Sequence, residues 1–273
     1  MGIELNGKRV LITGSSSGIG AALAVGFAER GAIVGICGRR SDRLAAVLEK
    51  CHVHSPESRS WTVDLADLEG LEAFAATVTA DLGGVDILVN NAGIPKRRWA
   101  WKLTGDVVDE VMSINFSSPV RLTLALLPQI IERNGAIVNV SSVAARLSPP
   151  AEASYAASKA ALTAFSEGLR VDLAVAGEQV GVHVLNPGVV DTELFGLPDN
   201  DASIADVEPV PVTDVIEPVV EMLRTGTFEA YVPAWFADVV PVKFPDTTAY
   251  LEGSIAYTRD RLEQLGLNPG VNR

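Results

Sequence analysis

The chain has few of the residues that stabilise secreted or metal-binding proteins. Among 273 residues there are two cysteines and three histidines, and Cys37 and Cys51 match no disulfide framework or paired metal motif. No apolar stretch approaches the roughly 18 uninterrupted residues that a membrane span needs. The N-terminus also lacks the basic start and apolar run of a signal peptide. We therefore expect a soluble, cytoplasmic protein with no metal site and no membrane span.

Positive charge is also scarce. The chain carries 22 Lys and Arg residues against 34 Asp and Glu residues, a formal net charge of −12. Contacts from basic side chains to phosphates supply most of the affinity for nucleic acid, so this composition argues against such a partner. Apolar residues make up 48% of the chain, which is enough for a sizeable core.

Short apolar runs alternate with longer helical patterns along the chain. The runs are continuously apolar, as strands buried on both faces of a parallel sheet are. They lie at 9–13, 32–37, 86–90, 136–140 and 180–185, and helix-length segments at 18–30, 41–50, 67–82, 104–130 and 153–176. No linker or repeat divides the chain. The pattern predicts one α/β domain over 1–273: a Rossmann-type, doubly wound parallel sheet of about seven strands with helices on both faces.

A glycine-rich loop, "TGSSSGIG" (13–20), lies between the first strand and the first helix. Gly14 permits a tight turn, Gly18 allows backbone to approach a pyrophosphate, and Gly20 allows close packing of helix and strand. The amides and dipole at the helix N-terminus favour a phosphate there. In this strand–loop–helix context the glycines predict a dinucleotide site.

Three residues separate the first two glycines, and this spacing resembles that of the short-chain dehydrogenases/reductases. Asp64 in "VDL" ends a further strand, the third, so that 86–90 is the fourth strand and 180–185 the sixth. This Asp64, "NNAG" (90–93) after the fourth strand and "NPGVVDT" (186–192) after the sixth carry the resemblance further, over roughly 7–232. It implies that Asp64 contacts the adenine amine and that Thr192, with the Val189 amide, binds the nicotinamide carboxamide. The cofactor residues implied in this part of the site are Gly14, Ser16, Ser17, Gly18, Ile19, Gly20, Asp64, Leu65, Asn91, Ala92, Gly93, Pro187, Gly188, Val189 and Thr192.

Tyr155 and Lys159 in "SYAASKAA" lie four residues apart, on one face of a helix. A free phenol has a pKa near 10, too high for acid–base work at neutral pH. A nearby ammonium and the positive nicotinamide of an oxidised cofactor lower that pKa. The Tyr-xxx-Lys pattern by itself also fits an exposed helical face.

The resemblance completes a catalytic set around this pair. Ser142 precedes Tyr155 by thirteen residues, the family spacing, and Asn115 in "VMSINF" matches the helix Asn that holds a water connecting the Lys to solvent. The implied mechanism has Tyr155 transfer the proton and Ser142 position the substrate oxygen, while Lys159 also binds the nicotinamide ribose. For Asn115 the alternative is a buried amide that satisfies backbone groups.

The second strand ends in "GICGRR" (35–40), where NAD-dependent relatives carry an acid. Gly38 occupies that position and leaves room for a 2′-phosphate, and Arg39 and Arg40 supply planar cations that bind phosphate oxygens well. We expect NADP(H), with Arg39 as the main phosphate contact and Arg40 assisting. The alternatives are NAD and two arginines that merely precede Ser41 at a helix start.

The substrate region is the least defined by sequence. The family places a substrate-covering loop after the Pro-Gly turn, here 190–214, and this loop carries Leu194 and Phe195. We expect the tail, 233–273, to be a C-terminal extension that covers either the edge of the sheet or the mouth of the active site. With Trp99 and Leu147 these residues favour an uncharged or lipophilic alcohol/ketone pair as the small-molecule substrate.

Three alternatives remain: an NAD-dependent alcohol dehydrogenase, a 3-oxoacyl thioester reductase, and an NADP(H)-sensing regulatory protein. The resemblance also implies a homodimer or homotetramer built through helices such as 153–176.

Overall fold

In the computed structural model, which describes residues 2–197, 200–268 and 270, seven strands form one parallel sheet. The strand order is β3-β2-β1-β4-β5-β6-β7. The strands are β1 (Arg9–Thr13), β2 (Ile33–Gly38), β3 (Arg59–Thr62), β4 (Ile87–Asn90), β5 (Ala136–Val140), β6 (Gly181–Pro187) and β7 (Glu229–Val232). The predicted doubly wound fold is confirmed.

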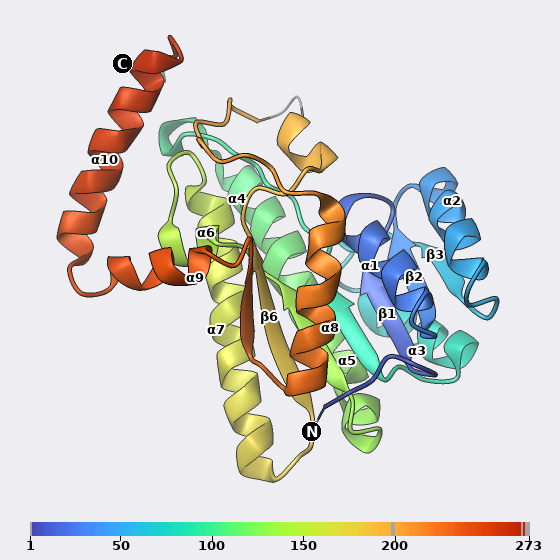
Figure 1. Ribbon diagram of the computed structural model, residues 1–273. Coiled ribbons are helices and arrows are strands. Elements are labelled where there is room, and N and C mark those ends of the chain that lie inside the picture. Colours follow the sequence, from blue (N-terminus) through green and yellow to red (C-terminus); the bar gives the residue numbers. More distant parts are fainter. Residues whose placement is uncertain (1, 198–199, 269, 271–273) are drawn as a thin grey trace.

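Helices cover both faces of this sheet (Figure 1). One apolar core packs under α1 (Gly18–Ala28), α2 (Ser41–His52) and α8 (Ile216–Thr225), and the other under α3 (Leu71–Leu82), α5 (Ser118–Glu132) and α7 (Ala153–Ala176). Within β1, Val10 and Ile12 enter the first core and Leu11 the second. Successive strand residues point to opposite faces, so two covered faces require the continuous apolar runs seen in the sequence.

The long helical segment expected at 104–130 is divided in the structure. It comprises α4 (Gly105–Met112), a π-helical turn, η2 (Ser113–Ser117), and then α5. The Thr104 hydroxyl caps α4 by accepting a hydrogen bond from the Val107 amide at 3.4 Å. Single π turns inside helices are frequent at functional sites, and this one carries the fully buried Asn115. Apolar periodicity does not reveal such a turn.

The order in which strands are added to the sheet reverses at β1. From there β2 and β3 extend to one side, and β4 to β7 extend to the other. In open α/β sheets, ligands bind in the crevice at the carboxyl ends of the strands where this reversal occurs. The loops that follow β1, β4, β5 and β6 therefore meet at one candidate binding edge.

The C-terminal extension consists of α9 (Phe236–Val239), a short 3₁₀ turn η5 (Val240–Lys243) and α10 (Thr247–Gln264). The helix α10 stands apart from the sheet at the left of Figure 1. The Tyr250 hydroxyl donates a 2.8 Å hydrogen bond to the Leu147 carbonyl, which ties α10 to the loop after β5. The tail thus lies beside the segment that follows β5.

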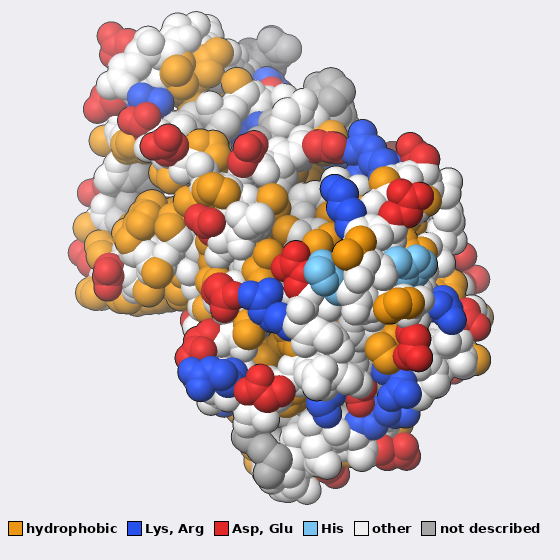
Figure 2. All heavy atoms as spheres, turned by 45° about the vertical axis from the view of Figure 1, so that its right-hand side comes forward, with side chains coloured by type: hydrophobic (Ala, Val, Ile, Leu, Met, Phe, Trp, Pro, Cys, Tyr) orange, Lys and Arg blue, Asp and Glu red, His pale blue; other side chains and the backbone are white. Residues whose placement is uncertain are grey.

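The molecular surface is of mixed charge. On the face shown in Figure 2, Lys and Arg side chains are interspersed with Asp and Glu, and they do not gather into one basic area. None of the helices in the described part of the chain is both long and apolar enough to span a membrane.

Candidate active site

A cavity of about 850 Å³ opens at the carboxyl edge of the sheet. The glycine loop, the ends of β2, β4, β5 and β6, the start of α7 and one side of α10 all line it. The sequence candidates on its wall are Gly14, Ser16, Ser17, Gly18, Ile19, Arg39, Arg40, Asp64, Leu65, Asn91, Ala92, Gly93, Ser142, Leu147, Tyr155, Lys159, Pro187, Gly188, Val189, Thr192 and Leu194. Residues predicted from motifs far apart in the sequence thus meet around one space.

The glycine loop is packed so tightly that side chains would not fit. Gly14 has φ +69°, and a Cβ there would lie 2.7 Å from the Ala92 Cα. Gly18 has φ +56°, and a Cβ at Gly20 would lie 2.5 Å from the Asn91 amide nitrogen. Gly20 does not line the cavity and instead permits close packing behind it. The first turn of α1 contains no acidic residue and its N-cap, Ser17, makes no capping hydrogen bond, so its amides face the cavity without a side-chain anion.

The loop after β4 is anchored to β1. Both the Asn91 and Ala92 amides donate 3.0 Å hydrogen bonds to the Thr13 hydroxyl, and the Asn91 side chain donates to the Thr13 carbonyl at 2.9 Å. These bonds hold "NNAG" against the glycine loop and make the centre of the cavity floor rigid.

Tyr155, Lys159 and Ser142 converge on one part of the cavity wall. The Lys159 Nζ lies 6.0 Å from the centroid of the Tyr155 ring and donates a 2.8 Å hydrogen bond to the Val140 carbonyl. The Ser142 hydroxyl accepts a 3.1 Å hydrogen bond from the Ala144 amide. The four-residue spacing on α7 and the end of β5 together produce this arrangement.

Burial dominates the electrostatics of these groups. It raises the pKa of the Tyr155 phenol, the charge of Glu152 raises it further, and a hydrogen bond from Ser142 opposes the change. Burial also lowers the pKa of Lys159 to about 8. The sequence predicts that Lys159 lowers the pKa of Tyr155. Among the protein's own groups, the desolvation of the phenol is the larger effect, because a buried phenolate loses its hydration.

Glu152 is a cavity residue that the sequence analysis missed. Its carboxyl is buried, which raises its pKa to about 7, and Arg97 opposes that change. Arg97 is itself only 5% exposed, and its Nε donates a 2.7 Å hydrogen bond to the Asp201 carbonyl. The signal available in the sequence was an acid at 152, three residues before Tyr155 and just ahead of the same helix.

Asn115 lies behind the cavity wall. Its Oδ1 accepts a 2.8 Å hydrogen bond from the Ile94 amide, and its Nδ2 donates to the Ile94 carbonyl and the Ser158 hydroxyl, each at 3.0 Å. A Cβ on Gly93 would meet the Asn115 Oδ1 at 3.2 Å and the Lys159 Nζ at 3.3 Å. The side chain therefore satisfies backbone groups, the alternative noted from sequence, while also lying near Lys159.

The two arginines after β2 differ in their surroundings. Arg39 is exposed, lines the cavity, and makes no hydrogen bond or ion pair within the described residues. The Arg40 guanidinium instead lies on the glycine loop, donating to the Ser17 hydroxyl at 2.6 Å and the Ser16 hydroxyl at 2.8 Å. A positive charge thus reaches a loop whose own residues are uncharged. A Cβ on Gly38 would be 3.7 Å from its nearest neighbour, the Ser16 hydroxyl, so there is space beside both arginines.

The predicted substrate residues are only partly brought together. Leu147 and Leu194 line the cavity, but Trp99 is not among the lining residues. Its ring instead stacks on Trp101 with centroids 5.1 Å apart. The side chain of Phe195 lies outside the described part of the structure. One wall of the cavity, which no sequence motif predicts, comes from α10 and consists of Ala249, Tyr250, Gly253, Ser254 and Tyr257.

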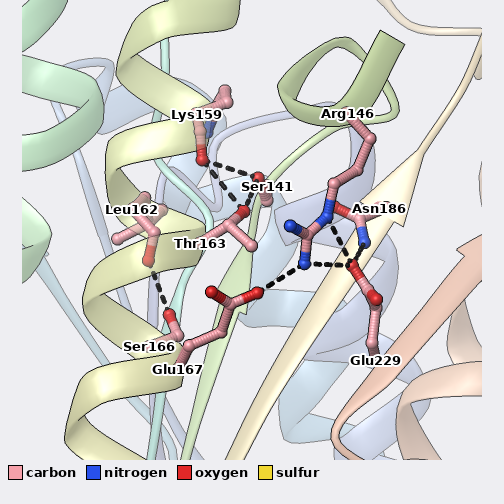
Figure 3. A network of polar contacts seen from close by, with 9 residues as sticks. All are labelled: Ser141, Arg146, Lys159, Leu162, Thr163, Ser166, Glu167, Asn186 and Glu229. Carbon is pink, nitrogen blue, oxygen red and sulfur yellow. Dashed lines mark hydrogen bonds and ion pairs between the residues drawn. The ribbon is translucent and has the colours of Figure 1, made fainter. Parts of the chain in front are cut away.

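A polar network fixes the segment that follows β5 (Figure 3). The Arg146 guanidinium binds Glu167 of α7 at 2.6 Å and Glu229 of β7 at 3.1 Å, and the Asn186 side chain donates to Glu229 at 2.7 Å. Ser141, next to Ser142, hydrogen-bonds the Thr163 hydroxyl at 2.8 Å, so it has a structural role at the strand end. The network holds the short helix α6 (Ala144–Leu147) and thereby the backbone beside Ser142.

Comparisons with known proteins agree with this architecture. Residues 8–201 match the family described as short chain dehydrogenase. A short chain dehydrogenase of Pseudocercospora fijiensis is 37% identical over 81% of this chain and 70% of its own length. A short chain dehydrogenase/reductase of Burkholderia phymatum in complex with NAD has a TM-score of 0.81, at 25% identity over 99% of both chains. One from Sphingobium yanoikuyae in complex with NADPH has a TM-score of 0.75, at 26% identity over 91% of this chain and 95% of that one. The protein belongs to the short-chain dehydrogenase family of oxidoreductases.

Proposed function

We propose that the protein is an NADP(H)-dependent oxidoreductase that interconverts an uncharged or lipophilic alcohol and its ketone. One observation carries this proposal. A single cavity is lined by the glycine loop and Arg39 as well as by Ser142, Tyr155 and Lys159. A dinucleotide bound to the first group would bring its nicotinamide to the second.

The residues present fit a nicotinamide dinucleotide. The backbone at Gly14 and Gly18 approaches the cavity without side chains, and the amides at the start of α1 have no side-chain anion, as a pyrophosphate requires. When bound, the cofactor supplies or accepts the hydride. The two related structures carry NAD and NADPH respectively, so the choice of cofactor depends on this chain's own residues.

NADP(H) is favoured by the end of β2. Gly38 introduces no acid, Arg39 has no protein partner within the described residues, and Arg40 lies on the adjoining loop. A guanidinium binds phosphate oxygens through paired N–H donors. Arg39 would be the main contact for the 2′-phosphate, and Arg40 would assist it.

The catalytic roles follow from chemistry and position. The Tyr155 hydroxyl would give its proton to the substrate oxygen or take it back, and Ser142 would orient that oxygen by a hydrogen bond. The Lys159 ammonium would stabilise the phenolate that remains. Asn115, which contacts Ile94 and Ser158, would support the route by which Lys159 exchanges its proton. A sensor protein would need none of these groups.

The proposed substrate class follows from apolar side chains in the cavity wall, which include Leu147 and Leu194. We also propose that the protein is a homo-oligomer. Three large apolar side chains on the outer faces of α5 and α7 support this: Leu124 is 54%, Val171 60% and Val175 84% exposed.

A titration of the purified protein with NADPH and NADH, followed by nicotinamide fluorescence, tests the cofactor assignment. We expect NADPH to bind at least about tenfold more tightly, a difference of about 1.4 kcal/mol, and Arg39→Ala to lose that margin. Equal or tighter binding of NADH would contradict the assignment. A ketone screen with NADPH then tests the activity.

A further inference from the structure

A carboxylate of the protein already occupies the arginine cluster beside Gly38. Glu193 directly follows Thr192 and begins the short 3₁₀ helix η3 (Glu193–Gly196). Its Oε2 accepts a 2.9 Å hydrogen bond from Arg40 NH1, and its Oε1 forms an ion pair with Arg43. The carboxylate therefore lies against two of the three arginines that follow β2. Hydrogen bonds from those arginines lower the pKa of the Glu193 carboxyl, so it remains negative at neutral pH.

The same guanidinium connects Glu193 to the glycine loop. Arg40 uses NH1 for Glu193 while its NH2 and Nε contact the hydroxyls of Ser16 and Ser17. Glu193, Arg40, Ser16 and Arg39 all line the cavity. Any anion bound at this end of the cavity meets a cation that is already shared with a carboxylate.

We propose that Glu193 is a specificity-determining residue that competes with the 2′-phosphate of the cofactor for Arg40 and so limits the preference for NADP(H). This inference rests on the proposed function. A carboxylate and a phosphate accept the same guanidinium donors, and the two anions repel each other when close together. A cofactor without the phosphate meets no such competition.

The exposure of the Glu193 and Arg40 side chains limits how much Glu193 can change NADPH affinity. The Glu193 side chain is 53% exposed and that of Arg40 41%, and exposed ion pairs are weak and screened by salt. We expect Glu193→Gln to tighten NADPH binding about fivefold at low ionic strength. NADH binding should change by less than about twofold, and the gain for NADPH should shrink in 0.5 M salt.

The test is a fluorescence titration of the full-length protein with NADPH and NADH at low and high salt. The variants are Glu193→Gln, Arg40→Gln and the double substitution, with Glu221→Gln as a matched control. Glu221 forms an exposed ion pair with Arg224, at 2.7 Å, outside the cavity, and its side chain is 55% exposed against 53% for Glu193. In the Arg40→Gln background the gain from Glu193→Gln should shrink to what direct repulsion between the two anions contributes, because the shared cation is gone.

The same titrations separate the proposed function from the role of Glu193. The proposed function concerns the ratio of NADPH to NADH affinity in the unaltered protein, and it fails if that ratio is near one or inverted. The inference concerns the change of that ratio on Glu193→Gln. An unchanged ratio, an equal gain for both cofactors, or the same gain in the Arg40→Gln background would each overturn it. A rise confined to NADPH and dependent on Arg40 would support it.

Discussion

The ammonium of Lys159 lies 6.0 Å from the centre of the Tyr155 ring and is held there by a hydrogen bond to the Val140 carbonyl. Both side chains come from one face of α7, and the carbonyl is the last one of β5. The sheet and the helix thus fix the cation beside the phenol before any ligand binds. Preorganised charge of this kind costs no rearrangement during the reaction.

Removing only the hydroxyl of Tyr155 tests its proposed role as proton donor. Tyr155→Phe keeps the ring that packs in the cavity but leaves no group to protonate the substrate oxygen. We expect turnover of a ketone with NADPH to fall by about 10²- to 10⁴-fold, while NADPH binding changes little. Tyr257→Phe, which alters another phenol on the wall of the same cavity, is the control. If Tyr155→Phe retained most of the activity, another acid would have to supply the proton.

Glu152 makes the stability of the protein depend on pH. Burial raises the pKa of its carboxyl from 4.5 to about 7, so the folded state holds a proton that the unfolded state releases between these values. Stability should therefore decrease as pH rises from about 4.5 to 7, by at most about 3 kcal/mol. Above pH 7, Glu152→Gln should be more stable than the unaltered protein.

Urea unfolding at pH 5 and pH 7.5 gives the free energy of unfolding of the unaltered protein and of each variant. The difference between the two proteins at each pH measures the contribution of the Glu152 carboxyl. Glu208→Gln, at an exposed position in the segment 200–211, is the matched control and should leave the pH dependence unchanged. Parallel stability curves for Glu152→Gln and the unaltered protein would show that the carboxyl titrates normally.

Much of the architecture was predictable because its signals are local. The apolar runs predicted the buried strands, since a strand covered on both faces has no polar side. The glycines of 13–20 were readable as well, because the structure leaves no room for a Cβ at Gly14 or Gly20. The Tyr155–Lys159 spacing likewise follows from the pitch of one helix.

The remaining features leave no mark in the apolar pattern or in the motifs. Glu193 reaches Arg40 across 153 positions of the chain, and the α10 wall comes from a tail with no family motif. The division of 104–130 by a π turn changes hydrogen bonding without changing the apolar pattern. Trp99 was predicted for the cavity because of its position after "NNAG", but its ring stacks on Trp101 instead.

Gly38 is the position at which cofactor preference should be reversible. A Cβ there would be in ordinary contact with its nearest neighbour, Ser16 Oγ at 3.7 Å, so an aspartate can be introduced without a clash at its Cβ. Gly38→Asp should weaken NADPH binding at least about tenfold through repulsion between the carboxylate and the phosphate. NADH binding should be maintained or improved. Gly38→Asn has the same shape without the charge, and equal losses in both variants would assign the effect to bulk.

The α10 wall should set the length of substrate that the cavity accepts. Gly253 lines the cavity, and a Cβ at this position would meet nothing within 4 Å, so larger side chains can extend into the cavity without disturbing the helix. Gly253→Leu should therefore leave NADPH binding and turnover of short ketones nearly unchanged. For long-chain ketones we expect kcat/KM to fall by about tenfold, the scale on which apolar pockets discriminate size. Gly253→Ala should give a smaller loss in the same direction. A uniform loss over all chain lengths would indicate that α10 acts on the fold and not on the fit of the substrate.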